Sequence, residues 1–195
     1  MSKHVIFVPG LGDHRSYGQN IAIQLWRLFG LKPHYLALGW GTKQGYAAKQ
    51  DRLLELVGSL YDAGNTVALV GVSAGASATL NAYASSNKIS KLICICGKIN
   101  NPQTVHLKTF EDNPDFEESV NLVSQSLATL NPNQIANIMS IHPWRDQTVP
   151  IADTIIVGAE ERTFPGWSHV SGIFFGIISG SVSISKFINS NKDLR

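Results

Sequence analysis

The distribution of apolar and polar residues divides the chain into short apolar runs and longer segments with helical spacing. Apolar, β-branched runs without polar alternation occupy residues 5–8, 66–70 and 91–96. Such runs are typical of parallel strands that are covered on both faces. Shorter runs at residues 35–38 and 138–141 predict two further strands. The pattern therefore predicts a buried sheet.

Between these runs, apolar residues recur at helical spacing. Residues 44–63 and residues 116–130 each have one apolar face, and Gly64 follows the first of them as a helix end. A third helix is expected after the first strand, with one broad apolar face and Gly30 at its end: Ile21, Ala22, Leu25, Trp26, Leu28 and Phe29. Alternating strands and helices predict a three-layer α/β fold, with a mainly parallel sheet of about six strands and helices on both faces.

The alternation is interrupted between residues 97 and 137, where turn signals surround the helix predicted at residues 116–130. This segment is either a cap or lid-like insertion over the carboxyl edge of the sheet or an ordinary crossover helix with a long loop, and we favour the crossover.

Near the C-terminus, the runs at residues 154–157 and 162–164 are alternatives for the last strand, or they form a hairpin together. The apolar tail from Val170 is broken by Gly176 and Gly180. It predicts a buried, bent terminal helix and no integral membrane segment.

Composition narrows the class of protein. A chain of 195 residues with 44% hydrophobic and 15% charged residues predicts a single domain, residues 1–195, with a generous core. A net charge of +2 without a basic run argues against a nucleic-acid partner. Cys94 and Cys96 are expected on the same face of one strand as small core residues. Because Met1 is followed almost at once by a strand, we expect a cytoplasmic protein without a signal peptide.

Candidate chemistry centres on the sequence Gly71-Val72-Ser73-Ala74-Gly75, which lies between the run at residues 66–70 and a helix of small residues. Ser73 is expected on a strained strand-to-helix turn, with room left by the two glycines for neighbouring backbone. The helix N-terminus favours developing negative charge. The five-residue pattern alone fits an ordinary turn equally well. Whether Ser73 is a nucleophile therefore depends on whether the chain also supplies a base and an acid.

A serine hydroxyl becomes a good nucleophile only beside a base, which in turn needs an acid to orient it. His169 fits the base because it lies in a loop before the terminal helix, and Asp146 fits the acid because it follows the strand at residues 138–141. Other residues stay open. Asp153 and Glu160 are rivals for the acid. His142 is close to Asp146 in sequence, but at a strand end a structural role is favoured. His14 follows the Pro-Gly-Leu-Gly loop and either contacts substrate or faces solvent.

These motifs resemble those of the α/β-hydrolase superfamily over nearly the whole chain, and in particular the small single-domain bacterial lipases and esterases. The resemblance rests on Pro-Gly-Leu-Gly at residues 9–12, the Gly-x-Ser-x-Gly motif at residues 71–75, Asp-x-x-Val-Pro at residues 146–150, and Gly-x-x-His ending at His169. It implies a Ser73–His169–Asp146 triad and an oxyanion hole formed by the backbone N–H groups of Leu11 and Ala74.

The substrate is expected to be a small, uncharged carboxylic ester with a short to medium acyl chain. Trp40, Trp144 and Trp167 fall on loops expected at the carboxyl edge, where they would line an apolar acyl pocket, and Arg145 is the one cation beside the triad residues. Neither metal-ligand spacing nor a phosphate-binding glycine loop occurs, so we expect no cofactor. The sequence does not predict an oligomeric state.

Two alternatives remain. The first is a non-catalytic or weakly catalytic protein-interaction module that keeps this fold. The second is a thioesterase or lipase that uses the same triad.

Overall fold

The computed structural model describes residues 1–190, and their strands form one six-stranded sheet in the order β2-β1-β3-β4-β5-β6. Every neighbouring pair is parallel. The strands are β1 Lys3–Val8, β2 Leu31–Tyr35, β3 Thr66–Val72, β4 Ile89–Ile95, β5 Ile138–Pro143 and β6 Glu160–Phe164.

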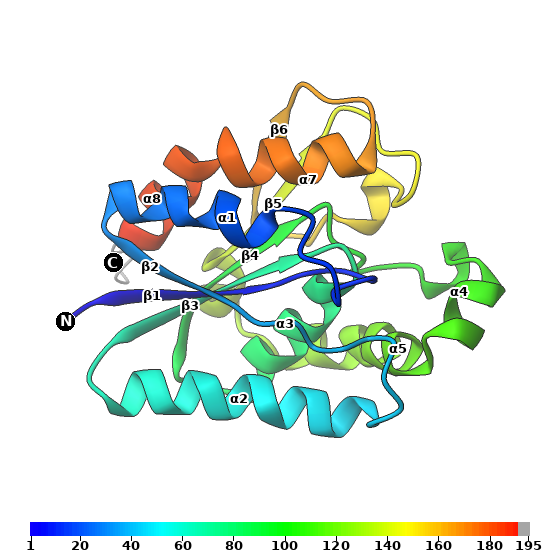
Figure 1. The fold of residues 1–195 in the computed structure, drawn as a ribbon, viewed down its shortest axis with the longest axis horizontal. Coiled ribbons are helices and arrows are strands. Elements are labelled where there is room, and N and C mark those ends of the chain that lie inside the picture. Colours follow the sequence, from blue (N-terminus) through cyan, green and yellow to red (C-terminus); the bar gives the residue numbers. More distant parts are fainter. Residues whose placement is uncertain (191–195) are drawn as a thin grey trace.

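Helices cover both faces of this sheet (Figure 1). Helices α1, α7 and α8 lie on one face, and α2, α3 and α5 lie on the other. The α-helices are α1 Gln19–Ala22, α2 Tyr46–Asp62, α3 Ala74–Ser85, α4 Leu107–Asp112, α5 Pro114–Thr129, α6 Pro132–Ala136, α7 His169–Ile178 and α8 Ser181–Asn189. Short 3-10 helices are η1 Ile23–Phe29, η2 Pro102–Thr104 and η3 Ile151–Asp153. The predicted three-layer α/β fold is confirmed.

The core consists of two clusters, one on each face of the sheet. Along β3, Val67 and Leu69 pack into the cluster under α2, α3 and α5, whereas Ala68 and Val70 pack into the cluster under η1, α7 and α8. Alternate residues of one strand thus enter different clusters, and both must be apolar. This double burial explains the continuous apolar runs in the sequence.

The second strand differs from its prediction. It spans Leu31–Tyr35, so residues 35–38 overlap it only at Tyr35. Strand β2 lies at the edge of the sheet, and within residues 1–190 it pairs only with β1. An edge strand tolerates Pro33, which has no N–H to donate. The apolar pattern failed here because an edge strand is less buried than a central one.

The helix expected after β1 also differs, because most of it is a 3-10 helix. Three residues per turn bring Ile23 and Trp26 into the core, and the Trp26 indole N–H donates to the Ile177 carbonyl at 3.0 Å. Ile21 and Leu28 remain 72% and 80% exposed. The prediction of one broad buried face was therefore wrong.

Both cysteines are buried and free, but they do not share a face. Cys94 packs in the cluster with Ala76, whereas Cys96 packs in the cluster with Ile95 and Ile173. The strand ends at Ile95, and Cys96 has a φ of 48°, which turns its side chain to the opposite side. Because the alternation of side chains along the strand breaks at Cys96, the prediction that both cysteines lie on the same face was wrong.

The C-terminal part resolves the open choice of last strand. Residues 162–164 belong to β6, which pairs in parallel with β5, while residues 154–157 form no strand, so there is no hairpin. Helices α7 and α8 meet at a bend of 55°, as the interrupted tail predicted. Within the described residues, no single helix is long and apolar enough to cross a membrane. The bent pair of α7 and α8 would be long and apolar enough if its two helices are counted together.

Candidate active site

Ser73 occupies the tight turn between β3 and α3, with φ 51° and ψ −120°. This conformation is strained for a residue with a side chain. A Cβ at Gly75 would lie 2.3 Å from the Val8 carbonyl oxygen, and one at Gly71 would lie 2.6 Å from the Ala76 Cα. Backbone therefore approaches the turn so closely that only glycine fits at these two positions.

Three residues from separate elements form a continuous hydrogen-bonded chain. The His169 Nε2 lies 2.9 Å from the Ser73 Oγ, and its Nδ1 lies 2.7 Å from the Asp146 Oδ2. Asp146 Oδ1 accepts the backbone N–H groups of Thr148 at 2.8 Å and Val149 at 2.9 Å. An ionised carboxylate only accepts hydrogen bonds, so Nδ1 carries the proton and Nε2 is left to accept the serine hydroxyl.

The Asp146 side chain has no solvent exposure. Burial alone would raise its pKa, but hydrogen bonds from His169, Val149 and Thr148 outweigh that cost and hold the pKa of Asp146 below its ordinary value. The carboxylate therefore stays ionised at neutral pH. Its fixed negative charge lies beside His169 Nδ1, where it can stabilise the imidazolium that forms while the serine proton is transferred.

The rival acids have other partners. Asp153 is buried and bonds to Lys98 Nζ at 2.5 Å and Thr104 Oγ1 at 2.5 Å. Burial would raise the pKa of Asp153, but these bonds, the largest from Lys98, hold it below its ordinary value. Glu160 pairs with Arg162 at 2.8 Å. Among the three candidate acids, the structure brings Asp146 to His169.

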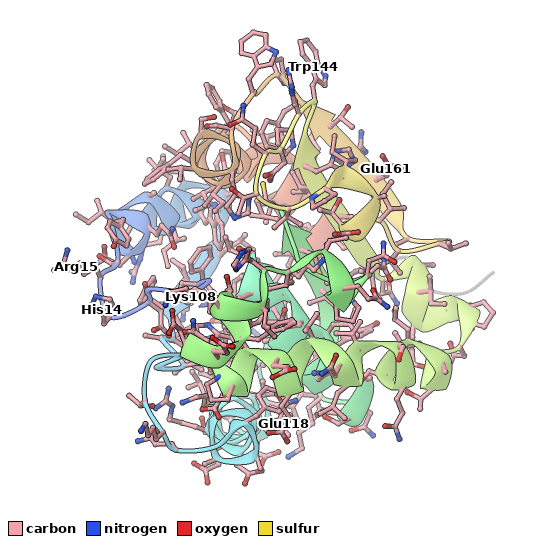
Figure 2. All side chains as sticks on the ribbon, turned by 90° about the vertical axis from the view of Figure 1, so that its right-hand side faces the viewer. His14, Arg15, Lys108, Glu118, Trp144 and Glu161 are labelled. Carbon is pink, nitrogen blue, oxygen red and sulfur yellow. The ribbon has the colours of Figure 1, made fainter. Side chains whose placement is uncertain are left out.

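The rival histidines also lie elsewhere. His142 is buried and its Nε2 lies 2.8 Å from Glu161 Oε1, the arrangement of a structural histidine. His14 is exposed, and Figure 2 shows it at the outer edge of the molecule.

Two cavities meet at Ser73, and Leu11, Ser73 and Thr148 line both. The smaller cavity has a volume of about 230 Å³, and its other lining residues are Ala74, Lys98, Thr104, Val105, His106, Thr109, Phe116 and Val149. The larger cavity has a volume of about 620 Å³, and its other lining residues are Gly10, Tyr17, Gln19, Val72, His169, Val170, Ile173 and Phe174. Leu11 and Ala74, the two predicted oxyanion donors, thus both face the smaller cavity.

The three tryptophans line neither of these cavities, which corrects their predicted contact with substrate. Trp40 is 1% exposed, and its indole N–H donates to the Pro9 carbonyl at 3.3 Å. Trp144 and Trp167 pack edge to face with ring centroids 6.4 Å apart and remain mostly exposed. Figure 2 shows Trp144 at the rim, away from the centre of this edge. A loop position alone did not determine where these side chains point.

Helical residues take the place that the tryptophans were expected to fill. Ile173 and Phe174 of α7 and Phe116 of α5 supply apolar cavity walls. Ile173 lies one helical turn after His169, so this spacing was a usable signal in the sequence.

The segment of residues 97–137 has two parts with different positions. Helix α5 packs against α3 on one face of the sheet, as a crossover helix would. Thr104 of η2 and the adjoining Val105 and His106 line the smaller cavity instead. Lys98 and Asp153 tie this part to the body through a buried ion pair of 2.5 Å.

Sequence reasoning missed a buried carboxylate behind the loop that contains Leu11. Asp13 accepts the backbone N–H groups of Gly39 at 2.6 Å and Trp40 at 3.3 Å. Lys49, also buried, donates to the Gly39 carbonyl at 2.8 Å. These bonds fix the loop after β2 against the loop after β1. Neither residue had a motif that distinguished it in the sequence.

One cluster has the ligand types of a metal site. Potential ligand atoms of Cys96, Asp146 and His169 all lie within 4.8 Å of one another. Burial raises the pKa of the Cys96 thiol, and the Asp146 charge raises it further, so the metal-binding thiolate is disfavoured. Asp146 and His169 bond to each other. This geometry supports the hydrogen-bonded chain and assigns no metal.

The fold is that of the α/β hydrolases. Neither a protein-family model nor a curated protein sequence matches this chain, but many solved structures do. The ydeN gene product from B. subtilis has a TM-score of 0.68 at 13% identity, covering 97% of this chain and 100% of that one. Est1E from Butyrivibrio proteoclasticus has a TM-score of 0.67 at 14% identity, covering 96% and 87%.

Some of the solved structures with this fold are described as esterases. The esterase domain of a Rhodothermus marinus protein has a TM-score of 0.64 at 12% identity, covering 95% of this chain and 88% of that domain. At such low identity, the likeness concerns the fold alone.

Proposed function

We propose that this protein is a serine hydrolase that cleaves small, uncharged carboxylic esters through an acyl-enzyme. The observation that carries the proposal is the hydrogen-bonded chain Ser73–His169–Asp146, with contacts of 2.9 and 2.7 Å, at the junction of two cavities. A serine that hydrogen-bonds to an oriented histidine on a strained turn is the arrangement that activates a hydroxyl for attack on a carbonyl.

The proposed reaction has two halves. Ser73 Oγ attacks the ester carbonyl while His169 Nε2 takes the hydroxyl proton, and the imidazolium then gives this proton to the departing alcohol. Water repeats the sequence on the acyl-enzyme and releases the acid. Asp146 stabilises the imidazolium throughout. The backbone N–H groups of Leu11 and Ala74 are the proposed donors to the oxyanion, and both residues line the smaller cavity together with Ser73.

From the position of His169 we assign the two halves of the substrate to the two cavities. The departing oxygen must reach His169, which lines the larger cavity and not the smaller one. The alcohol is therefore assigned to the larger cavity and the acyl chain to the smaller one. At about 30 Å³ for each water-sized group, a volume of about 230 Å³ holds roughly seven or eight such groups. This capacity supports a short to medium acyl chain.

Labelling with a fluorophosphonate probe tests the mechanism. We expect the wild-type protein to be labelled and Ser73→Ala to remain unlabelled although folded by circular dichroism. A folded wild-type protein that resists the probe and hydrolyses no ester would defeat the proposal. If it then also retained a stoichiometric partner in a pull-down, the interaction-module alternative would replace it.

A series of p-nitrophenyl esters tests the acyl assignment. Each added methylene should contribute about 0.8 kcal/mol until the smaller cavity is full, so kcat/KM should peak between butyrate and octanoate. A rise that continues to palmitate would contradict the assignment and favour a lipase. Preference for a thioester would change the substrate class but leave the triad in place.

We also propose a cytoplasmic location and a small-molecule substrate as the main partner. Two free, buried thiols, Cys94 and Cys96, are compatible with a reducing compartment. Fractionation of cells that express the tagged protein tests the location.

A further inference from the structure

The outer surface of one helical layer is unusually apolar. Helices α1, η1, α7 and α8 cover one face of the sheet (Figure 1). Large apolar side chains that these helices and the adjoining turn leave exposed form what we call the apolar face: Tyr17, Ile21, Leu25, Leu28, Phe29, Val170, Phe175, Ile178 and Val182. Leu28, Ile21 and Val170 are 80%, 72% and 66% exposed. Outward positions of a surface helix are normally polar, so a patch of this kind indicates a binding surface.

Charge is distributed unevenly between the two helical layers. Residues 14–34 and 163–190, which contain the apolar face, include neither Asp nor Glu, but they include the exposed cations Arg15, Arg27 and Lys186. The opposite layer carries seven exposed acidic residues on three helices: Asp51, Glu55 and Asp62 on α2, Glu111 and Asp112 on α4, and Glu117 and Glu118 on α5. The exposed cations on these helices are Arg52 and Lys108. Figure 2 shows Arg15 and Glu118 well separated on this edge of the molecule.

We propose that the apolar face binds the surface of a lipid bilayer that contains anionic headgroups. Apolar side chains of this kind insert at the boundary of headgroups and acyl chains, and Arg and Lys beside them attract anionic lipid. The lack of carboxylates on this layer removes the repulsion that such a surface would otherwise meet. The acidic layer then faces water.

The charges disfavour a second copy of this chain as the occupant. Two apolar faces packed together would bring Arg15, Arg27 and Lys186 of each copy into one interface, with no carboxylate from residues 14–34 or 163–190 to pair with them. Unpaired like charges oppose association at an interface. An anionic bilayer supplies the opposite charge that a second copy lacks.

The apolar face is continuous with the mouth of the larger cavity. Tyr17 and Val170 belong to both, and the cavity lies beside α1 and α7. Binding through this face would therefore bring the cavity toward the lipid, where apolar esters concentrate. This last step rests on the proposed function, whereas binding itself does not.

Vesicle flotation tests the surface independently of hydrolysis when the Ser73→Ala protein is used. We expect it to float with vesicles of equal parts phosphatidylcholine and phosphatidylglycerol, and to float less with phosphatidylcholine alone or at high salt. Failure to bind the mixed vesicles, or equal binding to both compositions, would overturn the proposal. The fluorophosphonate result stands separately, because it uses wild-type protein without lipid.

Single substitutions locate the binding surface. Leu28→Gln and Phe175→Gln should each weaken binding about fivefold by removing inserted apolar area, and Lys186→Gln should do so about fivefold by removing a cation. Val157→Gln is the matched control, because Val157 is 89% exposed but lies outside the apolar face. Equal effects at Val157 and Leu28, or a lipid-free dimer that Leu28→Gln dissociates, would refute a lipid-binding face.

Discussion

Replacing Asp146 with asparagine should disable the site through its hydrogen bonds while leaving the fold intact. In the structure, one carboxylate oxygen accepts two backbone N–H groups, from Thr148 and Val149, and the other faces His169. In Asp146→Asn, the amide oxygen would keep the two backbone donors, and the amide NH₂ would face His169 Nδ1. The imidazole would then carry its proton on Nε2, toward Ser73, and could not accept the serine proton.

The magnitude follows from two losses. Removing a unit charge about 4 Å from the imidazolium costs roughly 4 kcal/mol at an effective dielectric constant of 20, which is about three orders of magnitude in rate. The wrong tautomer adds to this loss, so kcat/KM should fall about 10³- to 10⁴-fold. The free energy of unfolding should change by only about 1 kcal/mol, because the backbone hydrogen bonds survive.

Asp153→Asn is the matched control, since it also removes one buried carboxylate near the site. It should leave Lys98, which is 3% exposed, without its ion-pair partner and lower the free energy of unfolding by about 3 kcal/mol. Ester hydrolysis by the folded fraction should persist. Steady-state kinetics and urea denaturation on both variants check the contrast. If Asp153→Asn lost more kcat/KM per folded molecule than Asp146→Asn, the assignment of the acid would be refuted.

Two further changes test the fold. Gly75→Ala should lower the free energy of unfolding by about 3 kcal/mol, because its Cβ would lie 2.3 Å from a backbone carbonyl oxygen. The control Gly58→Ala, whose Cβ would have its nearest atom at 3.8 Å, should raise the free energy of unfolding by up to about 1 kcal/mol. Urea denaturation measures both changes. Burial lowers the pKa of His34 and of its neighbour His4 below 6.5, so the unfolded state binds protons first as pH falls. Stability should therefore drop below pH 6.5, and less steeply in His34→Gln.

The sequence predicted the elements whose residues are constrained on every side. Strand β3 is buried on both faces, and the turn at Ser73 requires glycine at positions 71 and 75 because backbone occupies the space of a Cβ. Asp146 and His169 were inferred from their order and from the strands and helix beside them, and the structure places both within hydrogen-bonding distance of their partners.

The predictions that failed concern residues with weaker constraints. Pro33 and its polar neighbours lie on an edge strand, where burial imposes little pattern. Trp40 and Trp144 were assigned from loop positions, but tertiary contacts decide whether such a side chain enters the core or the solvent. The left-handed conformation of Cys96 has no sequence signal at all, since neither glycine nor asparagine marks it.

Helix α7 connects the position of His169 to the apolar face. Two of its four buried residues are glycines: a Cβ at Gly176 would lie 2.5 Å from Ile95 Cγ2, and one at Gly172 would lie 3.1 Å from Cys96 Sγ. These glycines let the helix lie close to the sheet, and its first residue, His169, reaches Ser73. Because glycines occupy inner positions of α7, some of its large apolar side chains, Phe175 among them, are exposed on its outer surface. Close packing at the site and an apolar outer surface thus arise from the same ten residues.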